Sequence, residues 1–101
     1  MLLIHGAGSY RRVWGPVMNR LAVERDVIAV DLPGHGDSPL MEEGVPPTPQ
    51  NFARLMVDFL RELGMESAHV AGNSSGGWTA LEMADSVLDV LLDGLSERRG
   101  S

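Results

Sequence analysis

Short runs of apolar residues alternate along the chain with longer stretches in which apolar side chains recur at helical spacing. The short runs are closed by glycine, proline or other turn-forming residues, which is typical of buried strands. We therefore predict buried strands at Leu2–Ile4, Asp26–Asp31 and Ala68–Ala71.

The longer stretches predict helices between and after these strands. The first helix follows the first strand. Its apolar positions are Trp14, Val17, Met18, Leu21 and Ala22. The second begins at Thr48–Pro49, a cap followed by a first-turn proline, and ends at Gly64. Its apolar positions are Phe52, Leu55, Met56, Phe59, Leu60 and Leu63. The third begins at Gly76–Trp78. Its apolar positions are Leu81 and Ala84.

Strands and helices therefore alternate along the chain. This order predicts an α/β fold, in which helices pack on the faces of a parallel three-stranded sheet. Residues 32–47 join the second strand to the second helix and are rich in turn-forming and acidic residues. We expect them to form a long surface loop.

The segment from residue 85 onward departs from this pattern. It divides the chain into a partial domain, residues 1–84, and an atypical tail, residues 85–101. Apolar residues continue at helical spacing as far as Leu95, whereas Val87–Leu92 alone is compatible with a short fourth strand. We favour a helix, because a turn at Asp85–Ser86 is short for a helix-to-strand connection. Residues Ser96–Ser101 are expected to fray.

Size and composition limit the classes of function. The chain has 101 residues, enough for one domain, and 22% of them are charged, as in ordinary soluble proteins. Its net charge of −6 argues against nucleic acid or an anionic membrane as a partner, because both are bound through basic surfaces. The lack of cysteine excludes disulfides, thiolate catalysis and cysteine-ligated zinc. With no basic leader and no apolar run long enough to span a membrane, we expect a cytoplasmic location.

The third strand leads into Gly72-Asn73-Ser74-Ser75-Gly76, which matches the pattern G-x-S-x-G between a strand and a helix. In that context Ser74 is the candidate nucleophile, on a turn so sharp that the flanking positions must be glycine, here Gly72 and Gly76. The Ser75 N–H would lie at the unpaired start of the helix, where it can bind an oxyanion. The alternative is an ordinary Gly/Ser turn without chemistry.

A second glycine-rich turn, His5-Gly6-Ala7-Gly8, follows the first strand. An oxyanion site needs another donor from the same edge of the sheet, and the carboxyl ends of parallel strands meet there. We predict that the Ala7 N–H is this donor and that Gly6 and Gly8 let the backbone approach closely. The alternative is a tight strand-to-helix turn that has no chemical role.

Together, the segments LLIHGAG, VIAVDLPGHGDSP and HVAGNSSGGWTALEMA resemble the α/β-hydrolase family in order and spacing, from residue 2 to about residue 84. The resemblance implies hydrolysis of an ester, thioester, amide or related bond in a small-molecule substrate, through an acyl-serine on Ser74. It implies no cofactor and no metal, and it gives His5 a supporting role in the oxyanion loop. A serine nucleophile argues against the dehalogenase and epoxide-hydrolase branches, which use aspartate at this position.

The resemblance also implies that the predicted strands are a central slice of a larger sheet, in the family order 4-3-5. Both edges of such a slice would be open, which favours self-association. The family orders its triad as serine, acid, then histidine, yet no histidine follows Ser74. We therefore expect an incomplete site. The chain could also be an inert fragment, or a piece that needs a partner chain to supply the base.

Candidates for the missing triad members are weak. His35 lies in the PGHG loop and His69 in or beside the third strand, and we expect a structural role for each. Asp89 and Asp93 follow the nucleophile, and we expect them on an exposed helix face. If the tail were a strand, Asp93 would lie at its end, near the place of a triad acid. Asp31 ends the second strand and is expected to orient the loop that follows it.

A remote alternative is a nucleotide-binding module. Gly6-Ala7-Gly8 follows a strand and Asp31 ends the next one, an arrangement faintly similar to a dinucleotide site. Arg11 stands where the third glycine of that pattern would be, and the serine turn has no part in this alternative.

Overall fold

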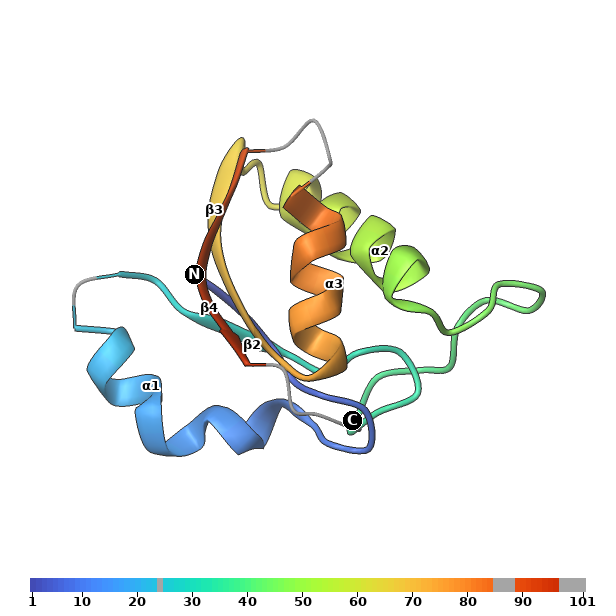
Figure 1. Cartoon of the computed structure of the whole chain (residues 1–101), viewed down its shortest axis with the longest axis horizontal. Coiled ribbons are helices and arrows are strands. Elements are labelled where there is room, and N and C mark those ends of the chain that lie inside the picture. Colours follow the sequence, from blue (N-terminus) through green and yellow to red (C-terminus); the bar gives the residue numbers. More distant parts are fainter. Residues whose placement is uncertain (24, 85–88, 97–101) are drawn as a thin grey trace.

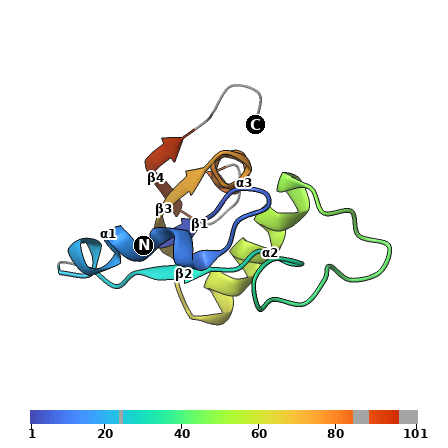
Figure 2. The ribbon, with the colours of Figure 1, turned by 90° about the horizontal axis from the view of Figure 1, so that it is seen from below.

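The computed structural model describes residues 1–23, 25–84 and 89–96. These residues form a parallel sheet with α2 and α3 on one face and α1 on the other side (Figure 1, Figure 2). The elements are, in chain order, β1 (Leu2–Ile4), η1 (Arg11–Trp14), α1 (Gly15–Leu21), β2 (Ile28–Val30), α2 (Pro49–Glu62), β3 (Ser67–Asn73), α3 (Ser75–Ala84) and β4 (Asp89–Ser96).

Strand β1 lies in the middle of the sheet, whose order is β2-β1-β3-β4. Leu2 is opposite Ile28 on one side and Val70 on the other, and all these pairs are parallel. The predicted strands and their relative order are confirmed. Every residue of β1 is buried, as expected for a parallel strand covered on both faces.

The tail forms a strand where we predicted a helix. β4 pairs in parallel with β3, from Ser67 opposite Asp89 to Asn73 opposite Ser96, so the sheet has four strands rather than three. The free edge of β3 supplies backbone partners, and this tertiary pairing outweighs the helical spacing of the apolar residues. The predicted turn at residues 85–86 and the predicted fraying of residues 97–101 lie outside the described residues.

Strand β2 is shorter and less buried than predicted. It covers Ile28–Val30 rather than residues 26–31, and all its residues are half-buried. Within the described residues it pairs only with β1, because it lies at the edge of the sheet. Ile28 and Val30 nevertheless pack against the core beneath α2 and α3.

Helix α2 begins and ends as predicted, but its buried face is rotated. The Thr48 side chain accepts a hydrogen bond from the Asn51 N–H at 3.2 Å, and Gly64 has a positive φ of 78° just after the helix. Leu55 and Leu63 are exposed, contrary to the predicted apolar face. The buried residues are Phe52, Ala53, Met56, Val57 and Leu60.

The buried faces of the other helices also differ from the prediction. In α3, Leu81 and Ala84 are exposed and Ala80 and Met83 are buried, because the close contact at Gly76 turns the small-residue face toward the sheet. In α1 no residue is buried, since this short helix covers only part of its face. Among the described residues, no helix is both long and apolar enough to cross a membrane.

Candidate active site

Ser74 lies at the turn between β3 and α3. Its φ of 59° makes it the one non-glycine residue with a positive φ in the described part of the chain. The helix starts at once, because the Trp78 N–H donates to the Ser74 carbonyl oxygen at 3.2 Å. The sharp turn that the motif predicts is therefore present, whereas the chemical role of Ser74 stays a prediction.

Glycines at positions 72 and 76 are required by backbone contacts. A Cβ on Gly72 would overlap the Gly76 carbonyl group, and a Cβ on Gly76 would overlap the backbone of Ile4 and His5. Any side chain at either position would push α3 away from β1 and β3. These close contacts hold the turn against the centre of the sheet.

The loop after β1 lies against the turn at Ser74. A Cβ on Gly6 would lie 3.0 Å from the Asn73 carbonyl oxygen and 3.2 Å from the Ser74 Cβ. The Ala7 N–H donates to the Ser75 Oγ at 2.8 Å, so a side-chain hydroxyl already occupies the donor that we predicted for an oxyanion. Gly8 makes no close contact at its Cβ position, and its φ of 76° is what requires glycine there.

His5 and His35 join this loop to the loop after β2. His5 is fully buried, with Nδ1 2.7 Å from the Gly6 carbonyl oxygen and Nε2 accepting from the Leu32 N–H at 3.0 Å. His35 accepts from the Gly8 N–H at 3.2 Å through Nε2, and its Nδ1 is 3.1 Å from the Pro33 carbonyl oxygen. The centroids of the two imidazole rings are 5.0 Å apart. Burial lowers the pKa of His5, which favours the neutral ring that these bonds require.

Arg11 and Asp31 form a second link between the same loops. The Asp31 carboxylate accepts hydrogen bonds from the Arg11 N–H at 2.6 Å and from the Asp37 N–H at 3.0 Å. It also forms an ion pair with the Arg11 guanidinium. The same guanidinium donates to the Asp37 carboxylate at 2.9 Å. The hydrogen bond from the Arg11 N–H is the main cause that lowers the pKa of Asp31. Gly36 leaves room for this carboxylate, because a Cβ there would overlap it. The sequence analysis did not identify Arg11 as the ion-pair partner of Asp31 and Asp37. A basic residue after one strand and two acidic residues after the next could have indicated this pairing.

The carboxylate of Asp31 is therefore already bound within the protein. A dinucleotide site would need it to accept hydrogen bonds from a ribose, and Arg11 and Asp37 use the oxygens instead. Within the described residues, no three His, Asp or Glu side chains lie close enough together to hold a metal ion.

The remaining candidates for a triad member lie away from Ser74. His69 is in β3, five residues before Ser74, or about 16 Å along an extended strand. In the register of β4, Asp89 is opposite Ser67 at the far end. Asp93 lies inside β4 at a register shift, between the partners of Val70 and Ala71, and not at the end of the strand as our strand alternative required.

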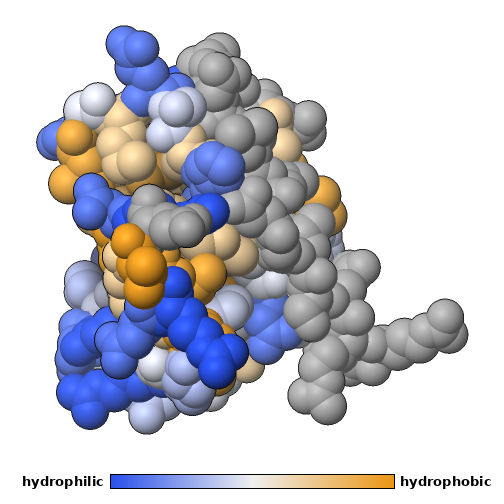
Figure 3. Space-filling view, turned by 90° about the vertical axis from the view of Figure 1, so that its left-hand side faces the viewer, coloured by the Kyte–Doolittle hydropathy of each residue, from blue (hydrophilic) through white to orange (hydrophobic). Residues whose placement is uncertain are grey.

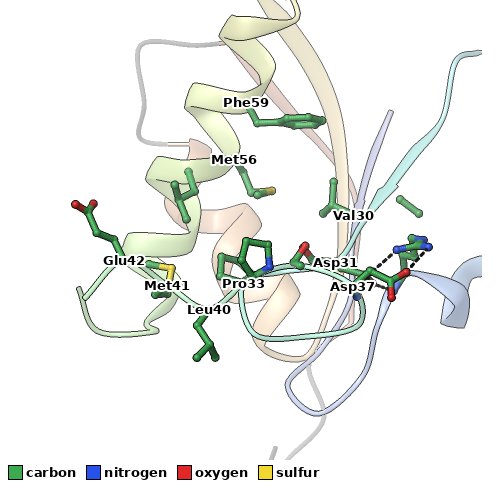
Figure 4. A pocket seen from close by; sticks show the side chains of 14 residues that line it. Val30, Asp31, Pro33, Asp37, Leu40, Met41, Glu42, Met56 and Phe59 are labelled. Carbon is green, nitrogen blue, oxygen red and sulfur yellow. Dashed lines mark hydrogen bonds and ion pairs between the residues drawn. The ribbon is translucent and has the colours of Figure 1, made fainter. Parts of the chain in front are cut away.

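A hollow of about 540 Å³ lies beside the edge strand β2, not at Ser74 (Figure 4). Met56 and Phe59 of α2 face it from one side, and Val30 and the loop after β2 face it from the other. The exposed Leu55 lines it as well, which accounts for an apolar side chain outside the core.

Comparisons with known proteins show which family the chain resembles. Residues 1–101 match the family model described as the alpha/beta hydrolase family. A dihydrolipoyllysine-residue acetyltransferase component of the acetoin cleaving system of Cupriavidus necator is 39% identical over 84 residues, which are 83% of this chain and 22% of that protein. An esterase of Mycobacterium tuberculosis is 34% identical over 91 residues, which are 90% of this chain and 30% of the esterase.

Solved structures show the same likeness. The crystal structure of the Mycobacterium tuberculosis esterase has a TM-score of 0.70 and covers 87% of this chain and 31% of its own. The epoxide hydrolase CorEH has a TM-score of 0.80 at 31% identity and covers 92% of this chain and 34% of its own. The chain thus spans between 22% and 34% of the length of these proteins.

Proposed function

Because this chain belongs to the alpha/beta hydrolase family, we propose that it is the part of a serine hydrolase that carries the nucleophile, Ser74. The observation that carries the proposal is the left-handed turn at Ser74, which the oxyanion loop contacts through Gly6. A strained, partly exposed serine between a strand and a helix is the arrangement that a nucleophile elbow requires, and Ser74 is half-buried. The substrate we propose is a small molecule with an ester, thioester, amide or related bond.

The choice of bond follows from the chemistry of the hydroxyl. When a serine oxygen attacks an acyl carbon, the leaving group departs and the product is an ester, which water can hydrolyse to free the serine. When the same oxygen opens an epoxide, the product is an ether, which water does not hydrolyse. Ser74 therefore favours acyl transfer, although some relatives, such as CorEH, are named epoxide hydrolases.

We propose further that the base comes from outside the described residues. Both ring nitrogens of His5 and of His35 lie within hydrogen-bond distance of backbone groups, which leaves neither imidazole free for the Ser74 proton. Further polypeptide or a partner chain could supply the histidine, and without one we expect the chain to be a poor catalyst. The alternative to this proposal is an inert fragment. An oxyanion site and binding alone can retain on the order of 10³-fold acceleration over water.

The test is covalent labelling of Ser74 by a fluorophosphonate. In this reaction the serine oxygen bonds to phosphorus, fluoride leaves with the electrons of the P–F bond, and the hydroxyl proton passes to solvent. We expect slow labelling that ends at one adduct per chain, on the peptide that contains Ser74, because neither His5 nor His35 is free to take the proton. No adduct should form in the Ser74→Ala variant or in the unfolded chain. Folded protein that carries no adduct would contradict the proposal and favour the inert fragment.

A further inference from the structure

We infer that the Ser75 hydroxyl, rather than the Ala7 N–H alone, presents the second hydrogen-bond donor to a substrate oxyanion. This inference rests on the proposed function, since it concerns the same site. Its first support is the contact between Ser75 Oγ and the Ala7 N–H at 2.8 Å, across 68 positions of sequence. The hydroxyl thus lies where the oxyanion loop and the start of α3 meet.

The direction of this bond determines what the hydroxyl can do. The Ala7 nitrogen is a donor, so Ser75 Oγ must be the acceptor, and its own hydrogen stays available for another acceptor. A hydroxyl that accepts one hydrogen bond becomes a stronger donor for the next, because successive bonds polarise one another. The hydrogen bond from the Ala7 N–H therefore makes the Ser75 hydroxyl a stronger hydrogen-bond donor.

The surroundings of Ser75 keep it in this position. Its carbonyl oxygen accepts from the Thr79 hydroxyl at 3.0 Å, and Thr79 is fully buried. Gly76, the next residue, packs so closely on the backbone of Ile4 and His5 that a Cβ would not fit there. Ser75 itself is half-buried, so a ligand can reach its hydroxyl.

The consequence is a site with donors from a single residue. In this arrangement the Ser75 N–H and the Ser75 O–H, both at the start of α3, would donate to the oxyanion, and the Ala7 N–H would act on it through the hydroxyl. A residue without a hydroxyl at position 75 would leave the Ala7 N–H to bind the oxyanion directly. The two arrangements differ in which atom contacts the developing charge, and substitutions at position 75 can separate them.

The experiment compares the rate of fluorophosphonate labelling at Ser74 in the wild-type chain, Ser75→Ala and Ser75→Thr. The phosphoryl oxygen of the probe takes the place of the oxyanion. We expect Ser75→Ala to lower the maximal labelling rate by on the order of 10²-fold with little change in the half-saturating probe concentration, as for loss of one oxyanion donor. Ser75→Thr keeps a hydroxyl and should restore most of the rate.

A second measurement tests the hydrogen bond without chemistry. In Ser75→Ala the amide proton of Ala7 should shift upfield and exchange faster with solvent, whereas Ser75→Thr should leave it nearly unchanged. Circular dichroism verifies that both variants are folded.

The outcomes separate the two proposals. No adduct on the folded wild-type chain overturns the proposed function and the role of Ser75 together. Normal wild-type labelling with an equal or faster rate in Ser75→Ala overturns the role of Ser75 alone, because the hydroxyl would then only fill the site. An unchanged Ala7 amide in Ser75→Ala also overturns it.

Discussion

At position 74 the backbone adopts a left-handed conformation, which is unfavourable for any residue that carries a Cβ. A left-handed residue with a Cβ costs about 1–2 kcal/mol, and the φ of Ser74 is 59°. The surrounding contacts sustain this strain, because Gly72 and Gly76 allow β3, α3 and β1 to touch through their backbones. The spacing of the glycines made this turn predictable. The bond from Ala7 to Ser75 was not, since it depends on two segments that only the folded sheet brings together.

The strain at Ser74 should lower the free energy of unfolding by a measurable amount. We expect the Ser74→Gly variant to be more stable than Ser74→Ala by about 0.5–1 kcal/mol in urea unfolding. Relief of the left-handed conformation gains about 1–2 kcal/mol, and the greater freedom of unfolded glycine opposes it by about 0.5–1 kcal/mol. Ser9, whose φ is not positive, is the matched control, and there the glycine variant should be the less stable of the pair. A Ser74→Ala variant as stable as Ser74→Gly would show that the turn is unstrained.

The loops that follow the neighbouring strands β1 and β2 are joined by hydrogen bonds between side chains of one loop and backbone N–H groups of the other. His5, after β1, accepts a hydrogen bond from the Leu32 N–H, after β2. In the other direction, His35 accepts from the Gly8 N–H. The Asp31 carboxylate accepts from the Arg11 N–H. The sequence located both loops by their turn-forming residues, and it correctly expected Asp31 to orient the loop that follows β2, where the Asp37 N–H donates to its carboxylate. It could not show the links between the loops, because hydrogen-bond partners 20 to 27 residues apart leave no periodic pattern. For the same reason the tail was assigned to a helix, since the edge of β3 that it joins is invisible in local spacing.

The buried His5 predicts a pH dependence of stability. Its pKa is lowered in the folded protein, chiefly by burial, whereas an unfolded histidine titrates near 6.5. Between these two values the unfolded chain binds a proton that the folded chain does not, so stability is fully present above about 6.5 and falls as the pH drops. We expect the unfolding midpoint to decrease from about pH 8 to about pH 5.5. The decrease should be smaller in His5→Asn and retained in His69→Asn, which changes an exposed histidine of β3.

At the scale of the whole molecule, the described sheet has two outer strands, β2 and β4. Apolar side chains also reach the surface on the side that carries α1, where Val13, Val17 and Val23 are exposed (Figure 3). An outer strand presents unpaired backbone groups that another chain can bind. The extent of the sheet was predictable only in part, because the family resemblance provided its central slice and the tail added a strand.

We propose that the chain self-associates through its outer strands. Light scattering should give a mass above the 10.9 kDa of one chain, rising with concentration. The Ile28 N–H donates toward β1, to the Met1 carbonyl oxygen at 2.8 Å, so the N–H of the next residue, Ala29, points outward. Ala29→Pro removes that outward donor and should lower association, because proline is tolerated where the strand faces solvent. A mass of one chain at every concentration would contradict the proposal, and undiminished association in Ala29→Pro would exclude β2.

The central position of β1 bears on how the chain folds as it is made. Both of its neighbours come later in the chain, at residues 28–30 and 70–72. On the ribosome, the Leu2–Ile4 segment would therefore remain without either partner until those residues have emerged, and contacts of such long sequence separation form slowly. During that interval the most apolar strand of the nascent chain is open to chaperones, so the speed of translation up to residue 72 should govern how much protein reaches the folded state.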